Sequence, residues 1–95
     1  LAVRATSDML LRRLFVSAAA VDPLHGSSEA TLDEAEVKLA MAKVSSEVIV
    51  AVDSSKLGQR APAAALGAAD VAILVTELEP TDRRLDPFRD AWTVR

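Results

Sequence analysis

Residues 48–56 read Val48-Ile49-Val50-Ala51-Val52-Asp53-Ser54-Ser55-Lys56. The first five of these residues are apolar and mostly β-branched, with no polar residue alternating between them. Strands with this pattern typically lie in the middle of a parallel sheet, where helices cover both faces. The four residues that follow are polar, so we expect the strand to end at Asp53.

Two more apolar runs, Leu14–Val21 and Val71–Val75, have the same character and are also predicted to be strands. The segments between the runs read as helices, which gives the order strand, helix, strand, helix, strand. In such a βαβαβ unit the crossovers are right-handed and the strands run in the same direction. The chain is therefore predicted to have an α/β fold with an open, mostly parallel sheet.

The segment between the first two strands carries the clearest helix signal. Thr31 is placed to cap the N-terminus of the helix, and Glu34 follows at the position that completes a capping box. An apolar stripe then recurs at helical spacing, formed by Val37, Ala40, Met41 and Val44. Glu34 and Lys38 are one turn apart and are expected to pair on the outer side. Ser45-Ser46 is expected to end the helix.

The remaining segments give shorter elements. Pro62 fits the first turn of a helix that runs through Leu66, with Gly67 as its stop. After the third strand, Asp86-Pro87 is expected to open another short helix, and Trp92–Val94 is expected to form an edge strand. Residues 7–12 are expected to form one or two helical turns.

Length and composition exclude several classes of protein. The 95 residues suffice for one small domain or part of one, and a hydrophobic content of 51% excludes a disordered tail. The absence of cysteine excludes disulfides and thiolate metal sites, and we expect no other cofactor. A formal charge of −3 with few aromatic residues argues against DNA binding by this chain alone. No membrane span or signal peptide is visible, so we expect a cytoplasmic protein.

Polar residues follow each of the three predicted strands. The exits are Asp22-Pro23, Asp53–Lys56 and Thr76-Glu77. Ligands in open parallel sheets bind at the carboxyl ends of the strands, so these residues are candidates for a binding site. Residues 53–56 offer a carboxylate, two hydroxyls and an ammonium, which suit a polyhydroxy compound with an anionic group. The alternative is that these residues only cap the turns that follow.

Other polar or aromatic residues have simpler interpretations. His25 is the single histidine, and we interpret it as a loop residue rather than part of a metal site or triad. Trp92 is expected to anchor the core. The arginines near the end of the chain are expected to form a solvated face; they are Arg83, Arg84 and Arg89.

Several stretches, in order and at matching spacing, resemble the sensor domain of DeoR-family transcriptional regulators. The stretches are Asp33–Met41, Val48–Val52, Asp53–Gly58 and Asp70–Thr76. The resemblance extends backwards through Phe15–Asp22 and His25-Gly26, and covers about residues 6–78. The chain departs from the family pattern at Ser17 and Ala20, where glycines are usual, and at Glu77, where Asp is usual.

The resemblance implies a fold similar to ribose-5-phosphate isomerase and the C-terminal part of a domain that senses a phosphorylated sugar or related metabolite. It implies that DNA is bound by a helix-turn-helix N-terminal to this chain. The family's phosphate-holding loop, which belongs to the effector site, is also expected upstream. The candidates for effector contact, including Ser54 from the polar cluster, are Asp22, Glu36, Lys38, Asp53, Ser54, Ser55 and Lys56.

Three functions remain open from the sequence. The first is a non-enzymatic sensor in which effector binding alters the affinity of the regulator for DNA. The second is a sugar-phosphate isomerase with Glu36 as the base and Lys56 as an electrostatic stabiliser, although the first strand exit has one acid, Asp22, where isomerases have a pair. The third is an oligomerisation or structural domain. In each case an uncovered edge strand and apolar face favour a homo-oligomer.

Overall fold

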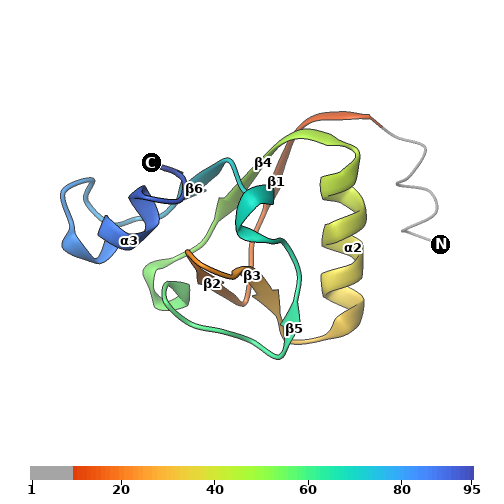
Figure 1. Cartoon of the computed structure of the whole chain (residues 1–95), viewed down its shortest axis with the longest axis horizontal. Helices are drawn as coiled ribbons and strands as arrows, with labels where there is room; N and C mark the ends of the chain where they lie inside the picture. Colours follow the sequence, from red (N-terminus) through yellow and green to blue (C-terminus); the bar gives the residue numbers. More distant parts are fainter. Residues whose placement is uncertain (1–9) are drawn as a thin grey trace.

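The computed structural model describes residues 10–95 and contains two sheets and two α-helices (Figure 1). The larger sheet has the order β1-β4-β6-β7, and a smaller sheet has the order β2-β3-β5. The strands are β1 (Leu11–Val16), β2 (Ala20–Asp22), β3 (Gly26–Glu29), β4 (Ser45–Ala51), β5 (Ala63–Ala64), β6 (Ile73–Val75) and β7 (Thr93–Val94). The helices are α2 (Leu32–Lys43) and α3 (Asp86–Arg89), with single 3-10 turns at η1 (Ser54–Lys56), η2 (Ala68–Asp70) and η3 (Arg83–Leu85).

All strands of the larger sheet run in the same direction, which confirms the predicted parallel α/β fold. Val50 of β4 pairs with Val16 of β1 on one side and with Leu74 of β6 on the other. The edge strand β7 pairs with β6. β4 is therefore central, as its unbroken apolar sequence predicts.

The hydrophobic core lies on one face of this sheet. Each connection in the order β1-β4-β6-β7 steps in the same direction, so right-handed crossovers place all three connections on that face. The strands contribute Leu14, Val48, Val50 and Leu74 to the core. The connections contribute Val21, Leu66, Val71, Phe88 and Trp92.

The other face of the sheet is open around β1. Phe15, Ile49 and Ile73 stand in register across three strands and alternate with the core residues, so their side chains point to this second face. Ile49 is buried between its neighbours, but Phe15 is 67% exposed. Within residues 10–95 the crossovers therefore leave Phe15, at the β1 edge of this row, exposed.

The helix α2 begins as the capping signal predicts, since Thr31 Oγ1 accepts a hydrogen bond from the Glu34 backbone N–H at 3.2 Å. The expected pair of Glu34 with Lys38 is not formed, because Lys38 turns inward to Glu29 at 2.9 Å. The apolar stripe is only half-buried, and the fully buried helix residue is Ala35, which packs on Ala63 and Ala65. The helix ends at Lys43, so Ser45-Ser46 starts β4 rather than ending the helix. None of the helices described between residues 10 and 95 is long and apolar enough to cross a membrane.

The prediction of one strand over Leu14–Val21 was wrong, because the run divides between the two sheets. β1 ends at Val16, and the chain turns at Ser17, whose carbonyl accepts a hydrogen bond from Lys38 Nζ at 2.6 Å. Ala19 then donates to the Ser28 carbonyl at 3.1 Å, so β2 pairs antiparallel with β3 instead of continuing beside β4. Asp22 therefore ends a strand of the smaller sheet.

The predicted helix from Pro62 to Leu66 was also wrong. Ala63–Ala64 forms β5, which pairs antiparallel with β3. Ser27 holds this segment in place, because its backbone carbonyl accepts from Ala65 N–H and its hydroxyl accepts from Leu66 N–H, both at 3.0 Å. These tertiary contacts override the helical propensity of the alanines.

The expected secondary structure differs from the observed one near the start of the chain and agrees with it near the end. Ser7–Met9 lies outside the described residues, and Leu11 and Arg12 belong to β1 rather than to a helical turn. The short helix at Asp86 and the edge strand at Thr93–Val94 are confirmed. Trp92 is buried and its indole N–H donates to the Ala68 carbonyl at 2.8 Å, which confirms its place in the core.

Candidate functional site

The carboxyl ends of β4 and β6 lie side by side. Ala51 pairs with Val75 at the last position of the two strands, and Val52 N–H donates to the Val75 carbonyl at 3.0 Å. The polar residues that follow, Asp53 on one strand and Thr76 on the other, are therefore neighbours. This register brings two of the predicted strand exits together.

Glu77 joins the two exits through hydrogen bonds. Its carboxylate accepts from the Ser54 backbone N–H at 2.8 Å, from the Ser54 hydroxyl at 2.7 Å and from the Thr76 hydroxyl at 2.9 Å. The hydrogen bonds from Ser54 and Thr76 lower the pKa of Glu77 to about 2. Glu77 is therefore a fixed anion at neutral pH that ties the β4 exit to the β6 exit.

Asp53 caps the 3-10 turn η1. Its carboxylate accepts hydrogen bonds from the hydroxyl and the backbone N–H of Ser55, the latter at 2.9 Å. These bonds lower the pKa of Asp53, and the nearby Lys56 ammonium contributes further. Carboxylate, hydroxyls and ammonium thus occupy one turn, as the sequence predicts.

The loop after η1 connects this cluster to the smaller sheet. Leu57 forms a parallel bridge with Val21, and Gly58 N–H donates to the Val21 carbonyl at 2.8 Å. The end of β2, where Asp22 follows Val21, therefore lies beside Leu57 and Gly58, which come directly after Lys56 in the chain. Asp22 reaches the same region although it does not end a strand of the parallel sheet.

Asp22 organises the turn that follows β2. Its Oδ1 accepts from the Leu24 and His25 backbone N–H groups at 2.8 and 2.9 Å, and it lies 3.1 Å from His25 Nδ1. Burial raises the pKa of Asp22, but the hydrogen bonds from His25 and Leu24 outweigh it and leave the pKa lowered. His25 is an exposed turn residue, as expected.

The two candidate residues on α2, Lys38 and Glu36, lie outside this cluster. Lys38 reaches the carboxyl end of β1, but its ammonium is bound to Glu29 Oε1 and the Ser17 carbonyl. Glu36 is exposed on the same helix. The structure therefore gathers Asp53, Ser54, Ser55 and Lys56 in one turn, whereas Asp22 lies at the end of β2, which contacts the loop after that turn.

Two residues near these positions were missed by sequence reasoning. Glu29 is almost fully buried in β3, and its Oε2 has no hydrogen-bond partner among residues 10–95. It sits in the polar run 27–29, which reads as a loop, so no pattern distinguishes it. Arg84 was assigned to a solvated face, yet it lines a cavity beside Ser54.

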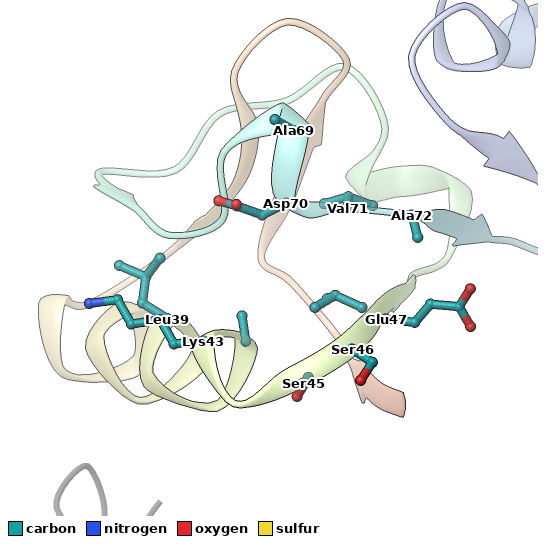
Figure 2. Close-up of a pocket in the computed structure, with 11 residues that line it drawn as sticks. Leu39, Lys43, Ser45, Ser46, Glu47, Ala69, Asp70, Val71 and Ala72 are labelled. Atoms are coloured by element: carbon teal, nitrogen blue, oxygen red, sulfur yellow. The ribbon is translucent and has the colours of Figure 1, made fainter. Parts of the chain in front are cut away.

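That cavity, of about 290 Å³, opens between the loop after β4 and the C-terminal segment. Its lining residues are Pro23, Ser54, Leu57, Gly58, Arg84, Pro87 and Phe88. A second cavity, of about 340 Å³, lies at the amino ends of β4 and β6, between α2 and η2 (Figure 2). Ligands of open parallel sheets bind at the carboxyl ends, which favours the first cavity.

No group of three or more His, Asp or Glu side chains in residues 10–95 is arranged to hold a metal ion. The polar groups of the strand exits instead form hydrogen bonds among themselves, with Ser54, Ser55 and Thr76 as donors and Asp53 and Glu77 as acceptors. Such groups can bind the hydroxyls of a small molecule, and Lys56 can meet an anionic oxygen.

Comparison with known proteins identifies a family for this chain. The model of the DeoR C-terminal sensor domain family matches residues 1–78, and this range includes the strand exits of β4 and β6. No curated protein matches the chain significantly. Because the family model covers most of the sequence, the chain belongs to the DeoR C-terminal sensor domain family.

Proposed function

We propose that this chain is the C-terminal part of a sensor domain that binds a phosphorylated sugar or a related metabolite without chemical turnover. One observation carries the proposal: the exits of β4 and β6 are joined by Glu77 and Ser54, and the loop containing Lys56 leads directly to the end of β2. We propose that the carboxylates, hydroxyls and one ammonium of these residues form a single rim around the effector. Sensing an effector also agrees with the family to which the chain belongs.

The chemistry of the rim suits such an effector. Asp22 and Asp53 can accept hydrogen bonds from sugar hydroxyls, and Lys56 can meet a phosphate oxygen as a point charge. The hydrogen bonds of Asp53 with Ser55 and of Glu77 with Ser54 hold these four residues in place before the ligand arrives, which reduces the entropy lost on binding.

The rim also offers a route from binding to regulation. Residues 53–58 follow β4 of the larger sheet, bond to Glu77 after β6 and bridge to Val21 of the smaller sheet, so a ligand that fixes this loop favours one arrangement of the two sheets over another. An effector shifts such an equilibrium only by the difference in its affinity for the two states. We propose that this shift changes the DNA affinity of a helix-turn-helix N-terminal to the chain, in a cytoplasmic homo-oligomer.

Thermal unfolding with a panel of sugar phosphates tests the proposal. A ligand present at about a hundred times its Kd adds about 2.7 kcal/mol to the stability of the folded state, which gives a clear rise in Tm. We expect at least one pentose or hexose phosphate to raise the Tm of the 95-residue chain. The variant Lys56→Ala is expected to lose this rise.

A matched lysine variant controls for the loss of a positive charge. Lys43 is exposed and lines the cavity at the opposite end of the sheet, so Lys43→Ala should retain the full rise in Tm. Loss of the rise in Lys43→Ala but not in Lys56→Ala would move the site to that second cavity. Turnover of ribose 5-phosphate by the chain would replace the sensor with the isomerase hypothesis.

A further inference from the structure

The cavity beside Ser54 is built from two parts of the chain. Pro23, Leu57 and Gly58 belong to the region that the family model matches, whereas Arg84, Pro87 and Phe88 lie beyond residue 78. A volume of about 290 Å³ is near the lower limit for small-molecule pockets, which suits a ligand the size of a monosaccharide. The C-terminal segment thus closes one side of the space next to the strand exits.

This C-terminal wall is a fixed part of the fold. Leu85, Phe88 and Trp92 are buried, and the Phe88 and Trp92 rings lie 6.0 Å apart in a tilted arrangement. The strand β7 then extends the sheet beside β6, where Arg95 N–H donates to the Leu74 carbonyl at 2.8 Å. A ligand in the cavity would therefore meet a preformed surface.

Asp82 fixes the orientation of the Arg84 side chain beside the cavity. Arg84 Nε and Nη2 donate to the two carboxylate oxygens of Asp82 at 3.1 and 2.8 Å. These bonds use two of the five N–H donors of the guanidinium group, and the side chain is 65% exposed. Arg84 can therefore donate to a ligand without leaving Asp82.

The charges around Arg84 favour a neutral partner. The hydrogen bonds with Asp82 raise the pKa of Arg84, and the Glu77 carboxylate adds to this effect, so two anions lie close to the guanidinium. An incoming phosphate would be repelled by both anions, whereas a hydroxyl can donate to a carboxylate and accept from the guanidinium. The apolar lining at Leu57, Pro87 and Phe88 suits the C–H face of a sugar ring.

We infer that the cavity between residues 54–58 and the C-terminal segment binds the uncharged, hydroxyl-bearing body of the effector, with Arg84 as a specificity-determining residue. This inference rests on the proposed function, in which the anionic group of the effector is bound at Lys56. The C-terminal segment then selects which sugar is sensed, while Lys56 provides affinity for the phosphate shared by all of them.

NMR titration of the 95-residue chain tests the inference, because it also measures weak binding. The probes are inorganic phosphate and a set of pentose and hexose phosphates. We expect Arg84→Ala to weaken the best sugar phosphate about tenfold, as the loss of one or two hydrogen bonds predicts, and to leave inorganic phosphate within about twofold. Arg83→Ala is the matched control, since Arg83 is exposed in the same turn η3 and does not line the cavity.

Each other outcome has a defined meaning. Equal weakening of phosphate and sugar phosphate by Arg84→Ala would make Arg84 an anion contact and overturn the inference. Equal affinities of Arg84→Ala and Arg83→Ala for the sugar phosphate would also overturn the inference about Arg84. In that case, loss of sugar-phosphate binding in Lys56→Ala would still support the proposed function. Failure of every probe to bind the wild-type chain would overturn both.

Discussion

Lys38 and Glu29 form an ion pair whose carboxylate side chain is 3% exposed and whose lysine side chain is 20% exposed. The pair links α2 to β3, and the same ammonium holds the Ser17 carbonyl at the point where the chain leaves β1. At the scale of single residues, this lysine therefore stabilises the junction between the two sheets. This role is separate from the predicted contact of Lys38 with the effector.

Removing one partner of this pair is expected to destabilise the fold strongly. Lys38→Met would leave the buried Glu29 carboxylate without a counter-charge, which we expect to reduce the free energy of unfolding by about 3 kcal/mol in urea titration. The double variant Glu29→Leu with Lys38→Met should recover most of that loss, because both charges are then absent. A loss of less than about 1 kcal/mol in the single variant would contradict this account.

Glu77 provides a prediction about pH. Its pKa of about 2 lies below the usual value of 4.5, so its hydrogen bonds stabilise the folded state above about pH 4.5 and are lost as the pH falls toward 2. NMR titration of the side-chain carboxyl carbons should show the midpoint of Glu77 near pH 2. Ser54→Ala removes the first of its hydroxyl donors and should move the midpoint toward 4.5; an unchanged midpoint would contradict the hydrogen-bond assignment.

At the scale of elements, the predictions succeeded where the pattern is local. The unbroken apolar run Val48–Val52 and the Thr31 cap identify β4 and α2 because strand burial and capping depend on adjacent residues. The smaller sheet was missed because β2, β3 and β5 contain only two to four residues each, and their pairing depends on partners up to about forty positions away. Alanine-rich residues 61–65 carry no signal for an extended conformation.

The candidate site could be predicted from the same local signals. Residues 53–56 lie at the carboxyl end of a parallel strand, and the register of β4 with β6 brings Glu77 to Ser54. The sequence could not predict Arg84, because its approach depends on how residues 80–95 fold back over the loop after β4. It also could not show that Asp22 arrives from a different sheet.

Two glycines with positive φ allow a test of how the smaller sheet is packed. Gly26, with φ of 90°, leaves no room for a side chain, since a Cβ atom there would overlap the Leu66 carbonyl and lie 2.9 Å from Ala68 N. Gly58, with φ of 74°, has open space around it. Gly26→Ala is expected to reduce the free energy of unfolding by about 3 kcal/mol or more, and Gly58→Ala by about 1 kcal/mol from backbone strain alone. Equal losses in urea titration would contradict the packing of β3 against Leu66.

For the molecule as a whole, the parallel sheet leaves a large apolar side chain exposed at its β1 edge within residues 10–95. The unbroken apolar sequence of β4 is typical of a strand that is covered on both faces, yet Phe15, which pairs with Ile49 of β4, is 67% exposed. Such a surface favours self-association, in agreement with the proposed homo-oligomer.

This open face leads to a prediction for the chain in solution. We expect sedimentation velocity to show association that increases with concentration, and Phe15→Ser to reduce it while changing stability by less than about 0.5 kcal/mol, because the ring is mostly exposed. Leu24→Ser is the matched control, since Leu24 is 78% exposed but lies in the turn after β2. Equal effects of the two variants would show that the face does not associate.

We propose that the effector binds at the carboxyl ends of β4 and β6. Amide chemical-shift mapping by NMR locates the binding site when the chain is titrated with a sugar phosphate that raises its Tm. We expect the largest chemical-shift changes at residues 53–58 and 76–77, with smaller changes at Asp22. Largest changes around Leu39, Lys43 and Asp70, which line the cavity at the opposite end of the sheet, would contradict this proposal.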